Sequence, residues 1–411
     1  MEKLLIIADD FTGSLDTGVQ FAGYDARIKI LTRPLYDFSS IERDVSVLVV
    51  NANTRHLSPE KAYETVYSIV KGALAAGFSH VYKKVDSGLR GNIGSELAAV
   101  MDAASLDNIH FVPSFPKLGR FVSGGRLFID GKPLTESIFA KDPFNPAHSD
   151  SVLDIISSST DKNVILNSFE GKGIHVYDAV TEEDLERLGR AIDEKCDLSA
   201  SAGCAGFAPY LAKALGYEGS RKKSCVLHNK LLIICGSINP VSFRQMEIAF
   251  SSGIRKFLIT TSEKINPSWP NSRSFNDYIS AVQMELEKNG IAIIDVNTDG
   301  RLIEEDDEVK ALGLSVETIR VRIAGLLGEI AKRFLDSDMP LTMFSIGGDT
   351  LKAIIDSLGC TEIVPVCELD AGVVLNQIVY RDREIPIISK SGGFGDDMTV
   401  MRIISKVKEN K

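Results

Sequence analysis

Residues 83–96 read KKVDSGLRGNIGSE and stand between two segments of different periodicity. Before them, His80–Val85 holds the β-favouring residues of a short strand, and after them Ile93–Ala104 places apolar side chains on one stripe of a helix. A loop that leaves the carboxyl end of a strand is where open α/β sheets bind their ligands. The lysines, aspartate, serine and arginine of this loop suit an anionic ligand that carries hydroxyl groups. A solvated turn is the alternative interpretation, and the loop by itself does not decide between the two.

The same alternation of strand and helix runs through the first half of the chain. Leu4–Ala8 and Val45–Val50 are continuous apolar runs, as expected for buried parallel strands. A helix is predicted to begin after Ser58, which can cap it, with Pro59 at its first position. Ile109–Val112 is the next strand. Strands spaced by helices indicate βαβ units and a mostly parallel sheet.

The periodicity fails between Pro113 and Asp150, which predicts a long irregular segment that acts as a lid, a binding loop or an interface. The second half repeats the pattern, with strands predicted at Leu231–Cys235, Phe257–Thr260, Ile291–Val296, Met343–Ile346 and Ile385–Ile388 and a long helix at Glu317–Phe334. A chain of 411 residues is too long for one ordinary core. The predicted fold class is therefore α/β with two domains, residues 1–222 and 223–411. Each is expected to be a mostly parallel sheet flanked by helices, with an active-site cleft between them.

Composition narrows the classes of function. The sequence is 44% hydrophobic and 25% charged, as in globular proteins. Its net charge of −10 disfavours nucleic acids and anionic membranes as partners, although it leaves room for a small acidic substrate. The six cysteines form no C-x-x-C pair, which argues against a disulfide framework or a structural metal site and favours the cytoplasm. No apolar run reaches the length of a signal peptide or of a membrane span.

Polar residues follow three predicted strands of the first half: Asp9 and Asp10, then Arg55, then the loop within residues 83–96. Adjacent parallel strands place their carboxyl ends side by side, so these residues could line one crevice. Helix capping is the alternative role for Asp9 and Asp10, and a surface salt bridge is the alternative for Arg55.

Three glycine-bearing turns join strand to helix in the second half. They are Cys235-Gly236-Ser237, Gly347-Gly348-Asp349-Thr350, and residues 389–397, which read SKSGGFGDD. Such turns present backbone N–H groups at helix N-termini, where phosphates bind, so nucleotide binding is predicted. No G-x-x-x-x-G-K-[ST] motif occurs, and no G-x-G-x-x-G opens the first βα unit of either half. The missing dinucleotide fingerprint argues against a nicotinamide-dependent dehydrogenase.

Taken in order along the chain, these motifs resemble the four-carbon acid sugar kinases. The matching segments are Asp9–Gly13, Asp86–Gly91, Pro113–Arg120, Gly131–Leu134, Gly236-Ser237, Gly347–Thr350 and Lys390–Gly395. The resemblance implies an ATP-dependent kinase that phosphorylates the terminal hydroxyl of threonate, erythronate or a 3-oxo-tetronate-type acid. It also implies that the N-terminal domain holds the acid and the C-terminal domain holds ATP.

The resemblance carries residue assignments as well. Substrate binding would fall to Asp9, Asp10, Arg55, Lys84, Val85, Asp86, Ser87 and Arg90. ATP binding would fall to Ser237, Gly347, Gly348, Asp349, Thr350, Gly392, Gly393 and Gly395. We expect Mg²⁺ to arrive with the nucleotide, whereas the family motifs do not fix the adenine pocket.

Phosphoryl transfer needs positioning and charge neutralisation more than covalent help. Arg55, Lys84 or Arg90 should clamp the substrate carboxylate. One carboxylate must orient or deprotonate the attacking hydroxyl, and Asp10, Asp86 and Asp396 are the candidates; we expect Asp86 to bind a hydroxyl and Asp10 or Asp396 to be the base. A non-catalytic regulatory protein that binds a sugar acid or a nucleotide is the alternative function. A homodimer is one assembly that the sequence allows.

Overall fold

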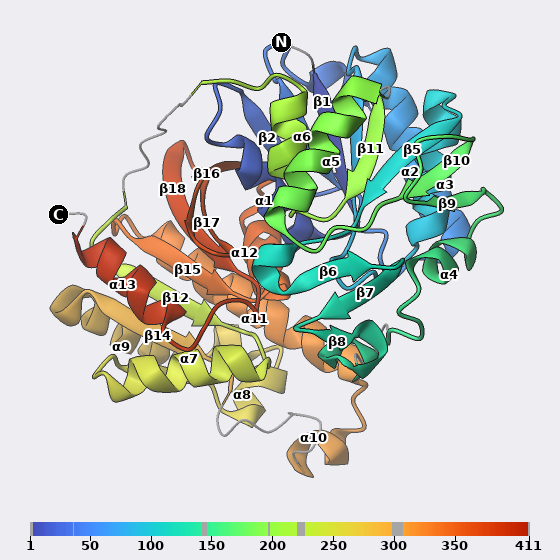
Figure 1. Ribbon diagram of the computed structural model, residues 1–411. Helices are drawn as coiled ribbons and strands as arrows, with labels where there is room; N and C mark the ends of the chain where they lie inside the picture. Colours follow the sequence, from blue (N-terminus) through green and yellow to red (C-terminus); the bar gives the residue numbers. More distant parts are fainter. Residues whose placement is uncertain are drawn as a thin grey trace. The chain divides into compact units, whose positions relative to one another are not determined.

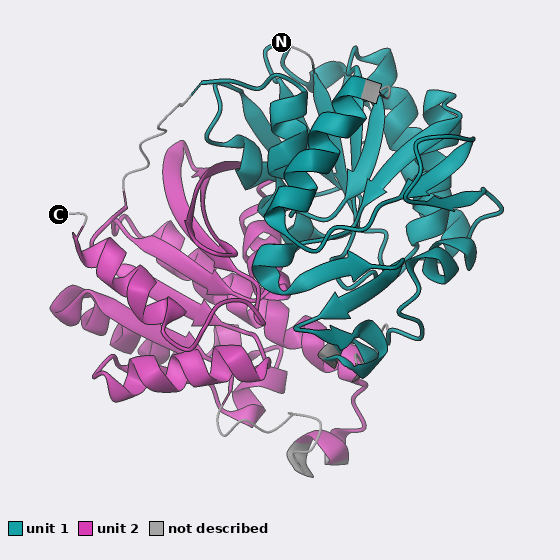
Figure 2. Cartoon of the chain, in the orientation of Figure 1, with its two compact units in different colours: residues 1–222 teal, residues 223–411 magenta. Residues whose placement is uncertain are grey.

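The computed structural model describes residues 3–35, 37–141, 146–195, 198–219, 227–297 and 307–409 (Figure 1). The chain divides into two compact units, residues 1–222 and 223–411 (Figure 2). Residues 220–226, which include the boundary, lie outside the described ranges. The described cysteines Cys204, Cys235, Cys360 and Cys367 are free thiols.

Unit 1 is built on a parallel sheet with the strand order β2-β3-β1-β4-β11-β5-β10-β9. Its strands are β1 (Leu4–Ala8), β2 (Ile28–Leu31), β3 (Val47–Asn51), β4 (His80–Lys84), β5 (Asn108–Val112), β9 (Val164–Leu166), β10 (Gly173–Val176) and β11 (Ala200–Gly203). The parallel sheet predicted for the first half is confirmed. The strands that the sequence pattern missed, β2, β9 and β11, are only three or four residues long.

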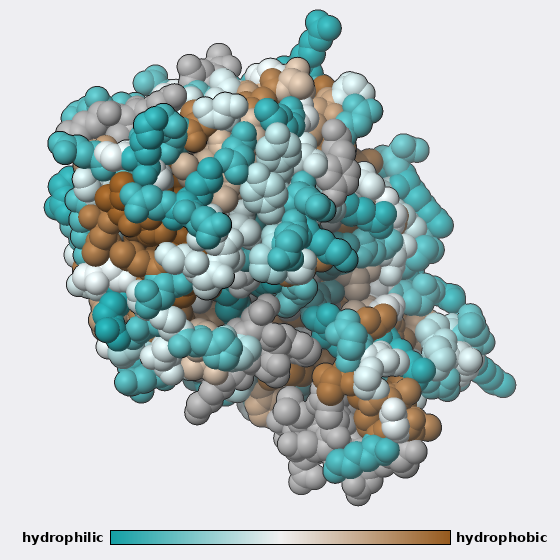
Figure 3. Space-filling model, turned by 90° about the vertical axis from the view of Figure 1, so that its right-hand side faces the viewer, coloured by the Kyte–Doolittle hydropathy of each residue, from teal (hydrophilic) through white to brown (hydrophobic). Residues whose placement is uncertain are grey.

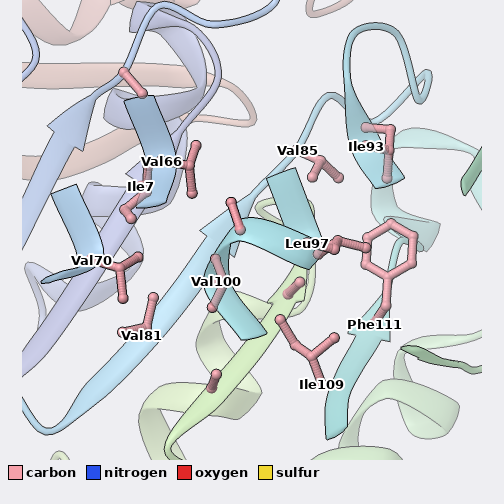
Figure 4. Close-up of a cluster of buried hydrophobic side chains, with 14 of the residues drawn as sticks. Ile7, Val66, Val70, Val81, Val85, Ile93, Leu97, Val100, Ile109 and Phe111 are labelled. Atoms are coloured by element: carbon pink, nitrogen blue, oxygen red, sulfur yellow. The ribbon is translucent and has the colours of Figure 1, made fainter. Parts of the chain in front are cut away.

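The helices of unit 1 are α1 (Phe11–Gly18), α2 (Pro59–Ala75), α3 (Ile93–Ala104), α4 (Val152–Ser157), α5 (Glu182–Lys195) and α6 (Ala208–Ala214). Side chains cap α1, α2 and α4, whereas α3 and α6 begin without a side-chain cap. Ser58 caps α2 through a hydrogen bond from the Lys61 amide, as predicted. Helices α2 and α3 bury Val66, Val70, Leu97 and Val100 against the sheet, in one cluster with Ile7, Val81, Ile109 and Phe111 (Figure 4).

The segment 113–150 differs from its prediction as an irregular stretch. It contains a small antiparallel sheet of β6 (Arg120–Ser123), β7 (Arg126–Ile129) and β8 (Lys132–Pro133). Gly124 and Gly125 both have positive φ, +59° and +70°, and form the two-residue turn between β6 and β7. A Gly-Gly pair flanked by alternating apolar residues is a hairpin signal, and the predominance of Pro and Gly in this segment obscured it.

Unit 2 has the strand order β13-β14-β12-β15-β18-β17-β16. Its strands are β12 (Leu231–Cys235), β13 (Lys256–Leu258), β14 (Ile291–Asp295), β15 (Thr342–Ile346), β16 (Glu362–Asp370), β17 (Val373–Tyr380) and β18 (Arg383–Lys390). The pairings β13–β14, β14–β12, β12–β15 and β15–β18 are parallel, as predicted. The pairings β16–β17 and β17–β18 are antiparallel. Arg381 and Asp382 make the turn between β17 and β18 with φ of +50° and +60°, although neither is glycine. This hairpin therefore lacked the usual turn signal in the sequence.

The helices of unit 2 are α7 (Pro240–Ser251), α8 (Thr261–Ile265), α9 (Arg273–Asn289), α10 (Asp307–Leu312), α11 (Val316–Asp336), α12 (Gly348–Leu358) and α13 (Thr399–Glu409). Among the described residues, no helix combines the length and apolarity that crossing a membrane requires. One face of the molecule shows mainly hydrophilic side chains, with apolar atoms confined to separate patches (Figure 3).

Candidate functional site

The carboxyl edge of the unit 1 sheet brings the predicted sugar-acid residues together. Strand β1 lies between β3 and β4, and its last residue, Ala8, is aligned with Asn51 and with Lys84. The residues that follow these three positions must therefore share one edge of the sheet. The two aspartates after β1, the turn that carries Arg55, and the loop after Lys84 all begin there.

Arg55 binds three carboxylates at this edge and so acts as its hub. Its Nε donates to Asp9 Oδ2 at 2.8 Å, one terminal nitrogen lies 2.9 Å from Asp10 Oδ2, and the other lies 3.5 Å from Asp86 Oδ1. Its side chain is only 11% exposed, so the surface salt bridge considered from sequence is ruled out. Burial acts to lower the pKa of Arg55, but the three carboxylates outweigh it and raise that pKa.

Asp86 is saturated with donors. Arg90 binds it in bidentate fashion, Nε to Oδ2 at 2.7 Å and a terminal nitrogen to Oδ1 at 3.0 Å. The amides of Gly88 and Arg90 also donate to Oδ2, at 3.2 and 3.4 Å. Burial acts to raise the pKa of Asp86, yet Arg55 and Arg90 hold it far below its usual range. The loop within residues 83–96 is therefore held in place by ion pairs and hydrogen bonds to Asp86, and it is not a solvated turn.

Lys84 is a buried cation with spare donor capacity. It is 5% exposed, and its ammonium makes no hydrogen bond or ion pair with the part of the chain that the structure describes. Its Nζ lies over α1, where a Cβ at Gly13 would approach it to 2.5 Å. Neighbouring Lys83 differs, because its ammonium pairs with Glu96 at 3.0 Å inside the core. Lys84 is therefore the member of the pair that can receive an anionic ligand.

The remaining predicted substrate residues differ in what they can offer. Asp10 caps α1, its Oδ1 accepting from the Gly13 amide at 2.9 Å, and its side chain is 25% exposed. The Val85 side chain points into the hydrophobic core and its amide donates to Gly203, which leaves only its carbonyl for a ligand. The Ser87 hydroxyl accepts a hydrogen bond from Arg120.

Arg120 and Phe139 belong to this site and were not assigned to it from the sequence. Arg120 begins β6, and Phe139 lies in the 3-10 helix Ile138–Lys141. The Phe139 ring lies between two guanidinium groups, with Arg90 Cζ 4.9 Å and Arg120 Cζ 5.2 Å from its centroid. Arg120 ends the matched segment Pro113–Arg120, which was the available signal, whereas nothing in the sequence pointed to Phe139.

The edge is rich in cations. The carboxylates of Asp9, Asp10 and Asp86 lie among Arg55, Lys84, Arg90 and Arg120, and a further carboxylate, Asp130, acts on Arg120. Four cations around one sheet edge favour an anionic ligand.

The three glycine turns of unit 2 also share one carboxyl edge, because β12, β15 and β18 are neighbours in the sheet. The Gly236 amide donates to Ile346 O at 3.2 Å, and the Gly347 amide donates to Lys390 O at 2.9 Å. Glycines at two positions allow the three turns to lie this close to one another. A Cβ at Gly392 would lie 2.1 Å from Ser237 Oγ, and Gly347 has a φ of +114°, which side chains disfavour.

Helix α12 begins at this edge without a side-chain cap. The amides of Gly348, Asp349 and Thr350 donate no hydrogen bond to any described residue. An uncapped helix N-terminus combines free N–H groups with the positive end of the helix dipole. The predicted ATP residues Ser237, Gly347, Thr350 and Gly392 meet here.

The two aspartates of unit 2 that the sequence assigned to the site, Asp349 and Asp396, are exposed. The Asp349 side chain is 70% exposed and lies 3.4 Å from Arg320. The Asp396 side chain is 66% exposed, accepts from the Met398 amide at 2.9 Å and pairs with Arg402 at 2.8 Å. The hydrogen bond from Arg402 holds the pKa of Asp396 below its usual value. Among the described residues, no group of three or more His, Cys, Asp or Glu could hold a metal ion by itself.

Comparison with known proteins agrees with this division. A family described as "Sugar-binding N-terminal domain" matches residues 4–211, and one described as "Nucleotide-binding C-terminal domain" matches residues 232–400. The chain belongs to the four-carbon acid sugar kinase family.

Full-length relatives have related activities. The chain is 27% identical to a D-threonate kinase of Salmonella typhimurium, with 99% of both chains covered. It is 26% identical to a D-erythronate kinase of Heliobacterium modesticaldum (96% of this chain, 95% of the relative) and 25% identical to a 3-oxo-tetronate kinase of Methylobacterium radiotolerans (95% of each). A solved structure of a Haemophilus influenzae protein superposes with a TM-score of 0.75 at 20% identity, covering 98% of this chain and all of that one. It shows that the fold is shared.

Proposed function

We propose that this protein transfers the γ-phosphoryl group of ATP to the terminal hydroxyl of a four-carbon sugar acid of the threonate, erythronate or 3-oxo-tetronate type. The observation that carries the proposal is the presence, in one chain, of a cation-rich edge that includes the buried Lys84 and of an edge with three glycine turns and an uncapped helix. Membership of a sugar-acid kinase family supports it.

On the sugar-acid side, we assign the substrate carboxylate to Lys84, with Arg90 and Arg120 beside it. Lys84 is buried and its ammonium makes no hydrogen bond to the described residues, so a substrate carboxylate would supply the acceptors that the ammonium lacks. Arg55 already binds three carboxylates, and its role is to fix their positions.

We assign the general base to Asp10. Asp86 is saturated by two arginines and two amides, which favours a role in holding hydroxyl groups and Arg90 in place. Asp396 accepts from the Met398 amide, pairs with Arg402, and belongs to the nucleotide-binding domain. Asp10 is on the sugar-acid side and is partly exposed, so a hydroxyl can reach it.

On the nucleotide side, we assign the ATP phosphates to the amides of Gly348, Asp349 and Thr350, to the glycine turn that includes Gly392, Gly393 and Gly395, and to the Ser237 hydroxyl. Mg²⁺ binds mainly to phosphate oxygens and water and needs only one or two carboxylates, so the exposed Asp349 carboxylate fits that need. Bound Mg²⁺ would neutralise phosphate charge during the transfer. The acceptor hydroxyl and the γ-phosphate must meet for transfer, and we propose that closure of the two domains brings them together and excludes water.

The test is a panel of C4 sugar acids incubated with ATP and Mg²⁺, with ADP release and product mass as readouts. The proposal expects one or a few acids to accept phosphate at the terminal hydroxyl. Binding of the acids or of ATP without turnover would instead establish the regulatory protein. Light scattering of the purified protein tests the homodimer, which stays a prediction, as does the cytoplasmic location.

A further inference from the structure

Lys390 ends β18 at the start of the glycine-rich turn, where a lysine would be expected to bind phosphate. It is 2% exposed, and its ammonium donates to three carbonyls of that turn: Ser391 O at 2.8 Å, Phe394 O at 2.9 Å and Gly392 O at 3.2 Å. A lysine ammonium carries three hydrogens, so these bonds use its whole donor capacity. Burial lowers the pKa of Lys390 to about 8, which leaves the ammonium mostly protonated at neutral pH.

Helix α7 holds the same turn from a second direction. Ser242 Oγ donates to Gly392 O at 2.6 Å, and Gln245 Nε2 donates to Asp396 O at 2.7 Å and to Phe394 O at 3.3 Å. Both side chains are fully buried. The turn therefore has its carbonyls fixed on the side of Lys390 and α7.

In a trans peptide, the carbonyl of one residue and the N–H of the next point in opposite directions. The carbonyls of Ser391, Gly392 and Phe394 face Lys390, so the amides of Gly392, Gly393 and Gly395 face away from it. Those three amides donate no hydrogen bond within the part of the chain that the structure describes. Gly393 and Gly395 are exposed. The orientation of the carbonyls thus leaves a row of amides available to an anion.

We propose that Lys390 is a positioning residue: it holds the carbonyls of the glycine-rich turn so that the amides of Gly392, Gly393 and Gly395 receive the nucleotide phosphates, and it does not itself bind phosphate. The proposal rests on the nucleotide role given above to this turn. Gln245, which is buried under the turn, is a second residue that positions it in this way.

The variants that test it are Lys390→Met and Gln245→Met, with Lys332→Met as the control, because Lys332 lies on α11 and pairs with Asp336 away from the turn. Calorimetric titration should show ATP-Mg affinity weakened about tenfold or more in both test variants, the scale of one lost charge-assisted hydrogen-bond system. Affinity for the sugar acid, which binds to the other domain, should stay within about twofold of the parent protein. If ATP-Mg affinity falls in Lys390→Met but not in Gln245→Met, Lys390 contacts phosphate directly and the proposal is wrong. Unchanged ATP affinity in Lys390→Met would also overturn the proposal.

A second measurement needs no nucleotide. Chymotrypsin cleavage after Phe394 in the native protein should be faster in both test variants than in Lys332→Met, because the Phe394 carbonyl loses a buried donor in each. Equal cleavage rates would contradict the holding role of Lys390 and Gln245. If the parent protein does not bind ATP but both test variants are still cleaved faster, the kinase function is overturned and the holding role of Lys390 and Gln245 is retained.

Discussion

Arg55 Nε donates to Asp9 Oδ2 at 2.8 Å, and this bond joins the turn after β3 to the end of β1. Asp9 is 1% exposed, so its charge is compensated inside the protein and not by water. Burial acts to raise the pKa of Asp9, but Arg55 and the two lysines outweigh it and keep the carboxyl ionised, with a pKa below its usual value.

Replacing Arg55 with Met should destabilise the protein strongly. The change leaves Asp9 buried without its main partner, a loss of about 3–5 kcal/mol when one member of a buried pair is removed. Urea unfolding of unit 1 measures it. Arg190→Met is the matched control, since Arg190 pairs with Glu186 on the surface of α5 and should cost about 0–1 kcal/mol. Equal effects of the two changes would refute the hub role of Arg55.

A methyl group at Gly13 should impair sugar-acid use more than stability. Its Cβ would lie 2.5 Å from Lys84 Nζ and 2.6 Å from Asp10 Oδ1, so the ends of both side chains must move. We expect Gly13→Ala to raise KM for the acid about tenfold with little change in KM for ATP, the scale of one charge-assisted bond. Gly325→Ala in α11 is the control, because its Cβ meets open space and should stabilise the helix. An unchanged acid KM would remove both Lys84 and Asp10 from the binding site.

Leucine at position 139 should loosen the two arginines that flank the ring. A cation–π contact contributes at least about 0.5–1 kcal/mol, and the ring makes two of them, so Phe139→Leu should weaken acid binding about five- to thirtyfold. Calorimetric titration with the acid provides the measurement. Phe121→Leu removes a ring from the stacked Phe121–Phe128 pair of the same unit and should leave acid affinity unchanged. Similar losses in both variants would mean that Phe139 acts through folding alone.

Amide substitution separates the three candidate bases. Asp10→Asn should lower kcat about 10²–10⁴-fold while the acid still binds, as expected when a general base is removed. Asp86→Asn should mainly weaken acid binding, and Asp396→Asn should change either parameter little. Steady-state kinetics and calorimetric titration together provide the test. Retained turnover in Asp10→Asn would disprove the assignment of the base.

Acid should destabilise unit 1 through His110. Burial lowers the pKa of His110 to about 4 from an ordinary value of 6.5, so the unfolded chain binds more protons between these pH values. The stabilisation is complete above pH 6.5 and is lost as the pH falls toward 4, by up to about 3 kcal/mol. Unfolding midpoints at pH 7 and pH 5 should differ less in His110→Gln than in the parent protein. His148→Gln, at an exposed position, should keep the parent difference; the same reduction there would argue against His110 as the source.

Much of the fold was predictable because its signals are local. The helix α3 has the predicted bounds, Ile93–Ala104, and α2 begins at Pro59 after the Ser58 cap. Apolar runs marked the buried parallel strands, and glycines marked the three turns of unit 2. The antiparallel hairpin of β17 and β18 escaped because its turn consists of Arg381 and Asp382 and contains no glycine.

The sequence by itself determined the α/β alternation, the loop that carries Asp86 and the glycine turns, because caps, periodicity and turn residues act between near neighbours in the chain. Only the tertiary structure decided which charges meet. Arg120 reaches Ser87 from a separate small sheet, Phe139 reaches Arg90 from a 3-10 helix, and Lys390 turns its ammonium to backbone carbonyls. Contacts of this kind depend on strand order and side-chain direction, which are set by the packing of segments far apart in the sequence.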